Sequence, residues 1–176
     1  EKELSRDFRR FDAGTHPSNT GKAEFANGPR GARVAKRLGL DIDPRSGRRR
    51  RAIEVYPHAA TIALFELDHI VRYKNKKGRD VDLLRGELLR LMGLVESIVR
   101  TDDTWAALRR DVEHATRKSQ LRVAEDQVDA VICAQVALMA HRTPEAVTTY
   151  GDLETGYIVT PTLAAPGAST GSHDDP

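Results

Sequence analysis

Cysteine is almost missing from this sequence: Cys133 is the only one in 176 residues. A single cysteine excludes a disulfide framework and a cysteine-based zinc site, and it fits a reducing compartment. Long hydrophobic runs are missing too, because no stretch approaches the ~18 apolar residues of a membrane helix. The chain also opens without the charged and then apolar pattern of a signal segment. We therefore expect a cytoplasmic protein with no membrane segment.

A large net charge is also absent. The formal charge is +2, although 31% of the residues are charged. This balance argues against a wholly cationic nucleic-acid coat and leaves room for a local basic patch. The sequence has no glycine-rich phosphate fingerprint, no histidine pair at zinc-ligand spacing and no Ser-His-Asp triad motif. Its length predicts one domain over residues 1–161, followed by a disordered tail rich in Ala, Pro, Gly, Ser and Asp over residues 162–176.

The stretch from Ile53 to Ala59 is the central motif of the sequence. Residues 53–56 are mostly strand formers, and Pro57 ends the strand because it has no N–H for a ladder. A short apolar helix follows over residues 58–65. Glu54 therefore lies beside a strand-to-helix turn. It is either the outward residue of an edge strand or a carboxylate at the ligand-binding end of a sheet.

Periodicity and turn residues predict the other elements. We expect, in order, a helix over 1–11, a long loop over 13–29, a basic helix over 30–38 capped by Gly39, a loop over 41–47, the four-arginine run 48–51, a basic loop over 73–79, a helix over 81–100, a helix that begins after the capping residues 101–104, a polar break over 117–120, a helix over 122–142, and a turn followed by a strand over 150–161.

Asp126 and Asp129 stand three residues apart near the start of the predicted 122–142 helix. This spacing puts both carboxylates on one face, one turn apart, and Cys133 and Val136 continue that face. The pair is thus predicted to lie at the rim of a buried surface. A favourable position in the field of a helix N-terminus is the competing explanation, and it accounts for one aspartate better than for two.

Carboxylate oxygens are the ligands that Mg²⁺ or Mn²⁺ prefers. Two such ions about 3.5–4 Å apart can clamp a phosphodiester, one activating water and the other stabilising the leaving oxygen. Glu54, Asp126 and Asp129 are the candidate ligands. The basic loop offers four candidate phosphate contacts, or it is simply a solvated run of charge; they are Lys74, Lys76, Lys77 and Arg79.

Four motifs in order carry a family resemblance: residues 53–59, 73–79, 126–134 and 150–161. Together they resemble a predicted ribonuclease-H-like nuclease family, long catalogued as a domain of unknown function, over nearly the whole chain to Pro161. The Asp-x-x-Asp-Ala helix is also similar to the last active-site helix of RuvC-type resolvases. This resemblance implies that Asp126 and Asp129 are metal ligands and that Glu54 is the family's acidic strand residue. It implies that the loop lysines contact phosphate.

Two strands that such families carry are absent from the sequence: one with a Gly-x-Asp motif and one with an Asp-x-Pro-type motif. The resemblance therefore implies an α/β, ribonuclease-H-like fold that is N-terminally incomplete, helix-rich and poor in strands. The expected function is hydrolysis of DNA or RNA by a divalent-metal-dependent nuclease. A non-catalytic nucleic-acid or protein interaction module on the same fold is the alternative, and a small-molecule phosphohydrolase is a third reading.

Overall fold

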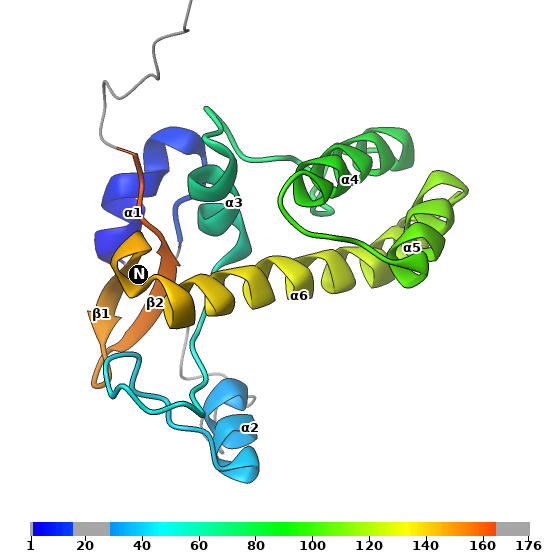
Figure 1. The fold of residues 1–176 in the computed structure, drawn as a ribbon. Helices are drawn as coiled ribbons and strands as arrows, with labels where there is room; N and C mark the ends of the chain where they lie inside the picture. Colours follow the sequence, from blue (N-terminus) through cyan, green and yellow to red (C-terminus); the bar gives the residue numbers. More distant parts are fainter. Residues whose placement is uncertain (1, 16–28, 165–176) are drawn as a thin grey trace, which may run out of the picture.

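The computed structural model describes residues 2–15 and 29–164. Most of the expected 13–29 loop and of the expected disordered tail lies outside these residues. The described chain is a helix-rich mixture of α and β structure, as expected (Figure 1). Its elements are α1 (Lys2–Phe8), η1 (Arg9–Phe11), α2 (Arg30–Leu38), α3 (Pro57–Phe65), α4 (Val81–Glu96), α5 (Asp103–Glu113), α6 (Lys118–Arg142), η3 (Pro144–Ala146), β1 (Val147–Asp152) and β2 (Gly156–Pro161).

Helix α6, with 25 residues, crosses the molecule from one side to the other (Figure 1). It begins at Lys118, so the polar break expected over residues 117–120 is wrong. The side chain of Gln120 accepts the backbone N–H of Arg117 at 3.0 Å and closes the first turn. Polar residues that resemble a loop in the sequence therefore cap the helix. Buried residues recur along one face of α6 at helical spacing: Leu121, Ala124, Val128, Ile132 and Val136.

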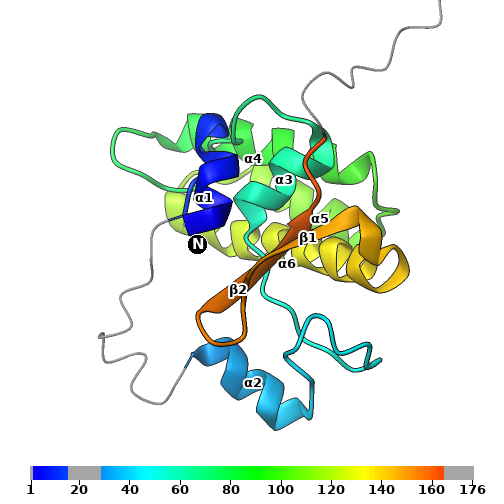
Figure 2. The same cartoon turned by 90° about the vertical axis from the view of Figure 1, so that its left-hand side faces the viewer.

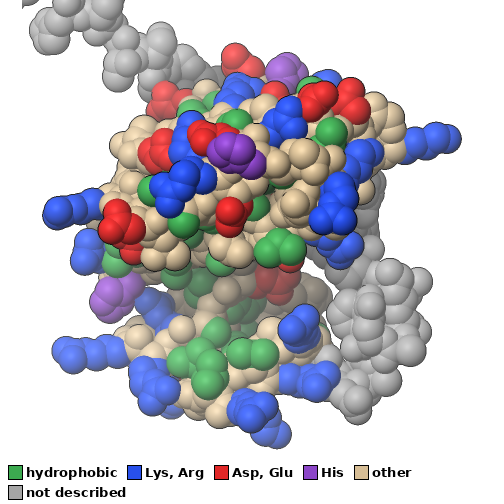
Figure 3. Space-filling view, turned by 90° about the vertical axis from the view of Figure 1, so that its right-hand side faces the viewer, with side chains coloured by type: hydrophobic (Ala, Val, Ile, Leu, Met, Phe, Trp, Pro, Cys, Tyr) green, Lys and Arg blue, Asp and Glu red, His purple; other side chains and the backbone are tan. Residues whose placement is uncertain are grey.

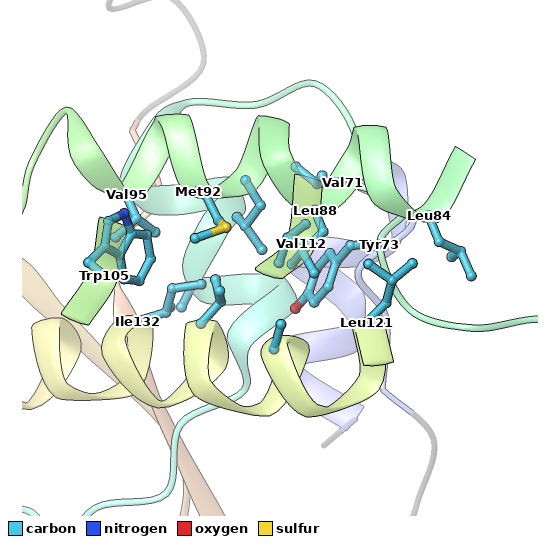
Figure 4. Packing of buried hydrophobic residues seen from close by; sticks show 14 of the residues in the cluster. Val71, Tyr73, Leu84, Leu88, Met92, Val95, Trp105, Val112, Leu121 and Ile132 are labelled. Carbon is cyan, nitrogen blue, oxygen red and sulfur yellow. The ribbon is translucent and has the colours of Figure 1, made fainter. Parts of the chain in front are cut away.

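The main hydrophobic core lies between α6 and the helices α4 and α5 (Figure 4). Leu84, Leu88 and Met92 follow one face of α4 at intervals of four residues and are essentially inaccessible to solvent. Helix α4 ends at Glu96, so the prediction of a helix to Arg100 was too long. Trp105 closes the end of this core from α5, and its indole N–H donates to Glu96 at 2.8 Å.

A second, smaller cluster holds α1 and α3 against the two strands (Figure 2). Leu4 and Phe8 of α1 are fully buried there, with Ala59 and Ile62 of α3. The phenol of Tyr150 on β1 donates to Asp7 at 2.9 Å and fixes α1 to the sheet. The two clusters place α3 between α6 and α1.

The sheet has only two antiparallel strands, β1 and β2, in a register that pairs Val147 with Pro161 and Asp152 with Gly156. The turn expected before the terminal strand is present at residues 153–155 and is followed by β2, but residues 150–152 before it belong to β1, a strand that was not predicted. The strand predicted over residues 53–56 is not formed, which corrects the sequence analysis. Val55 makes a single parallel bridge to Val159, and the Val159 N–H donates to the Glu54 carbonyl at 2.8 Å. A strand needs a neighbour along its length, and β2 runs beside this segment for one bridge only.

No helix within residues 2–15 and 29–164 is long and apolar enough to cross a membrane.

Candidate functional site

The structure places the three predicted carboxylates in different environments. Glu54 and Asp126 are exposed, whereas only 15% of the Asp129 side chain is exposed. Asp129 borders the buried stripe of α6, as its sequence position predicted, but Asp126 lies outside it. Among the described residues, no group of three His, Cys, Asp or Glu side chains could hold a metal ion. The three residues therefore do not form a common cluster there, and their role as metal ligands stays a prediction.

Asp129 is instead surrounded by residues that the structure brings to it from two elements. The Tyr73 hydroxyl donates to Asp129 Oδ1 at 2.7 Å, and Lys74 Nζ donates to Asp129 Oδ2. Lys74 Nζ also lies 3.0 Å from Glu125 Oε1. Figure 4 shows Tyr73 directed from its loop toward α6. We call these four residues, Tyr73, Lys74, Glu125 and Asp129, the Asp129 cluster.

Sequence reasoning missed Glu125 and the Tyr73 hydroxyl. Glu125 precedes Asp129 by four residues, so both lie on one helix face on consecutive turns. The neighbouring buried positions Ala124 and Val128 put that face at the edge of the core. The signal for Glu125 was therefore present in the spacing. The contact with Tyr73 was not, because it joins residues 56 positions apart.

Lys74 is the charge that balances the two carboxylates. Its side chain is 28% exposed. Burial acts to lower the pKa of Lys74, but its hydrogen bonds to Asp129 and Glu125 and their negative charges outweigh burial and raise it above its usual value. The pKa of Tyr73 is also raised, first by burial and then by the charge of Asp129 and the hydrogen bond to it. At neutral pH the cluster thus contains an ammonium ion and a neutral phenol, both directed at Asp129.

His58 adds a neutral imidazole beside the cluster. It lies in the first turn of α3, and only 9% of the residue is exposed. Its ring stacks edge-on against Tyr56 and Tyr73, with centroid distances of 5.6 and 5.3 Å. Its Nδ1 atom is buried without a hydrogen-bond partner in the described chain. Burial, with the charge of Lys74, lowers the pKa of His58 to about 4, so the ring is uncharged at neutral pH.

The basic loop divides into two kinds of cation. Lys76 and Lys77 are exposed, which fits both a phosphate contact and a solvated run of charge, so their role stays a prediction. Arg79 is used inside the loop, where its guanidinium donates to the carbonyls of Arg72 and Lys74 at 3.0 and 2.8 Å. Arg79 therefore shapes the loop that presents Lys74 to α6. The guanidinium that was predicted to contact phosphate is thus already engaged by two backbone carbonyls.

Cys133 lies one turn beyond Asp129 on α6, and its thiol is expected to react slowly. Burial and then the charge of Asp129 raise its pKa to about 11. Because the thiolate is the reactive form, alkylation by iodoacetamide at pH 8 should be about 100-fold slower than that of an unperturbed cysteine. Timed alkylation followed by mass spectrometry of the folded protein measures this rate. Reaction as fast as that of the urea-unfolded protein would contradict the expectation.

Two adjoining clefts flank the C-terminal half of α6. The first, of about 410 Å³, lies between α6 and residues 40–55 and is lined by Arg49, Cys133 and His141, among others. The second, of about 610 Å³, continues past Arg51 toward Val147 of β1. None of the four residues of the Asp129 cluster lines the first cleft, but Cys133, which does, is one turn from Asp129 on α6.

Comparison with known proteins bears on the family rather than on the chemistry. A search of curated proteins found no match, and neither did a search of solved structures. The family described as "Protein of unknown function (DUF429)" matches residues 1–155, which include the whole Asp129 cluster and the segment around Glu54. A match over that much of the sequence makes the chain a member of this DUF429 family.

Proposed function

We propose that this protein is a divalent-metal-dependent nuclease with a ribonuclease-H-like fold that hydrolyses phosphodiester bonds of DNA or RNA. The observation that carries the proposal is the convergence of the Asp129 and Glu125 carboxylates on a single cation, Lys74 Nζ. The resemblance of the Asp-x-x-Asp-Ala helix to the last active-site helix of RuvC-type resolvases supports it. The exposed Lys76 and Lys77 on the adjoining loop support a polyanionic substrate.

The donor set fits Mg²⁺ or Mn²⁺. Two carboxylates are a common protein contribution to a magnesium site, which is completed by waters and substrate phosphates. Asp129 and Glu125 are already arranged around one positive charge. Glu54 and Asp126 are ligands on the resemblance alone. When bound, a divalent ion supplies stabilisation of the charge that develops on phosphoryl oxygens and lowers the pKa of a water ligand.

The residues of the chain have separate roles in this proposal. Asp129 and Glu125 hold the ion, and the Tyr73 hydroxyl orients Asp129 through its 2.7 Å hydrogen bond. Lys74 balances the two carboxylates without metal and would be released to contact a phosphate if a metal ion took its place. His58, buried and neutral at pH 7, packs against Tyr73 and helps to hold it in place.

Calorimetric titration with Mn²⁺ tests the site directly. We expect Mn²⁺ to bind the wild-type protein, and we expect Asp129→Asn and Glu125→Gln each to weaken the affinity about 10-fold or more, because each removes a charged oxygen ligand. Lys74→Met should tighten binding, since the ammonium no longer competes for the carboxylates. All variants are checked for folding by circular dichroism.

Asp126→Asn separates the sequence prediction from the arrangement in the structure. If the ion is held by Asp129 and Glu125, Asp126→Asn should bind Mn²⁺ much as the wild type does. Loss of binding in Asp126→Asn but not in Glu125→Gln would support the ligand set predicted from sequence. Absence of Mn²⁺ binding in both the wild type and Lys74→Met would contradict the metal site.

A non-catalytic nucleic-acid or protein interaction module is the second candidate. The ion pairs of Lys74 favour it, because they balance both carboxylates without a metal ion. Under this alternative Lys74→Met lowers stability by leaving two partly buried carboxylates unpaired, and Mn²⁺ does not restore the stability.

A further inference from the structure

The segment from residue 30 to residue 51, which we call the basic arm, carries a charge very different from that of the rest of the chain. Nine of the 28 Lys and Arg residues lie in it, but only two of the 26 Asp and Glu residues do. The arm therefore has a formal charge of +7, and the remainder of the chain has a charge of −5. The small net charge of the protein conceals a separation of charge between two regions.

The α2 part of the arm stands apart from the helical body. Helix α2 lies below the other helices in both views of the fold (Figures 1 and 2). Arg30, Arg33 and Arg37 follow one another at helical spacing on α2 and are exposed. Figure 3 shows Lys and Arg side chains around the α2 part of the surface, with a hollow between it and the body.

Three arginines hold the arm in shape, and the others are available to a partner. The guanidinium of Arg50 donates to the Leu38 carbonyl, that of Arg51 donates to the Pro44 carbonyl, and Arg48 pairs with Asp41. Six more side chains make no hydrogen bond or ion pair with another residue that the structure describes: Arg30, Arg33, Lys36, Arg37, Arg45 and Arg49.

The base of the arm is anchored to the body. The Tyr157 hydroxyl on β2 donates to the carbonyls of Ile42 and Ala52 at the base of the arm. Arg49 and Arg51 then line the cleft against α6 that ends at Cys133, one turn from Asp129. From Asp129 to His141 at the far end of this cleft, α6 rises ~18 Å, which is the length of about five base pairs.

We infer that the basic arm is the principal nucleic-acid-binding surface of this protein and that it binds the phosphodiester backbone without a metal ion. Eight of the nine cations are arginines, whose planar guanidinium pairs with phosphate through two hydrogen bonds. A membrane surface fits less well, because the arm has no aromatic residue and its large exposed apolar side chains are limited to Val34, Leu38 and Ile42. The choice of nucleic acid as the polyanion rests on the proposed function.

Equilibrium binding in EDTA tests the inference. Fluorescence anisotropy of labelled 20-base-pair DNA and RNA duplexes and of the single strands is measured at several salt concentrations. The arm variant is Arg33→Gln, Lys36→Gln and Arg37→Gln together, because glutamine preserves helix propensity. We expect it to lose about 10-fold or more in affinity and to reduce the slope of log K against log salt by about 2–3.

The matched control removes the same charge elsewhere. Arg90, Arg100 and Arg110 are exposed on the α4 and α5 side of the molecule. Their triple Gln variant should bind within about 2-fold of the wild type, because it keeps the arm. Equal weakening in both triple variants, no effect of the arm variant, or no binding by the wild type would overturn the inference. Arm-dependent binding to phosphatidylserine vesicles in place of nucleic acid would overturn it as well.

Measuring binding in EDTA and cleavage with Mg²⁺ or Mn²⁺ separately keeps this inference distinct from the nuclease proposal. Arm-dependent binding in a protein that never cleaves with Mg²⁺ or Mn²⁺ would retain the inference and contradict the nuclease. Cleavage that the arm variant performs with unchanged affinity would retain the nuclease and contradict the inference.

Discussion

Replacing Asp129 by asparagine should reduce Mn²⁺-dependent cleavage of nucleic acid on the order of 1,000-fold. A bound divalent ion contributes several kcal/mol to phosphoryl transfer, and each 1.36 kcal/mol is tenfold in rate. Asp129 is the carboxylate on which two donors converge, Tyr73 and Lys74, so its charge is the centre of the cluster. Asparagine keeps the shape and one oxygen but removes that charge. The initial rate of hydrolysis of labelled DNA and RNA measures the effect.

The same assay assigns the neighbouring residues. Glu125→Gln should lower the rate of cleavage about 10-fold or more, because it removes one of the charged carboxylates that surround the cation. Tyr73→Phe should lose less, since it deletes one hydrogen bond and leaves the charge. Full cleavage by Asp129→Asn, in a protein freed of contaminating nuclease by repeated chromatography, would contradict the proposed role of Asp129.

Acidification from pH 6.5 to pH 4 should remove up to about 3 kcal/mol of stability through His58 alone. Its pKa is lowered from 6.5 to about 4 by burial and by the nearby charge of Lys74, with smaller contributions from Lys76 and Arg79, whereas the negative charge of Asp129 acts to raise it. The unfolded chain therefore takes up a proton at His58 before the folded chain does. The contribution is complete above pH 6.5 and declines as the pH falls toward 4, and a pKa difference of about 2.5 corresponds to ~3 kcal/mol.

His58→Phe measures this contribution. Phenylalanine keeps the edge-on ring contacts with Tyr56 and Tyr73, and it removes a buried nitrogen that has no partner in the described chain. Urea unfolding at pH 7 should give a free energy equal to or above that of the wild type. Between pH 6.5 and pH 4 the free energy of unfolding of the variant should fall by about 3 kcal/mol less than that of the wild type. His114→Phe, at an exposed histidine, is the control. An equal reduction in the pH dependence of its free energy of unfolding would refute the assignment to His58.

Elements whose signals are local were predictable from the sequence. Helix α2 is where its basic residues and Gly39 place it, and Gly39 caps it in the left-handed conformation at φ 62°. Helix α6 was evident from the spacing of Val128, Ile132 and Val136. The segment 53–56 was not predictable, because β propensity describes how residues fit a sheet and not whether a neighbouring strand is present.

The candidate site shows the same division. The sequence by itself determined that Asp129 borders a buried stripe and that a lysine-rich loop exists, since helical periodicity and composition are local properties. Only the tertiary structure decided that Lys74 and Tyr73 contact Asp129. It also decided that Lys74 pairs with Glu125 and not with the exposed Asp126. The position of the basic arm beside α6 is likewise a result of the tertiary structure. Such contacts join residues distant in the chain. They follow from how helices pack, which no single stretch of sequence specifies.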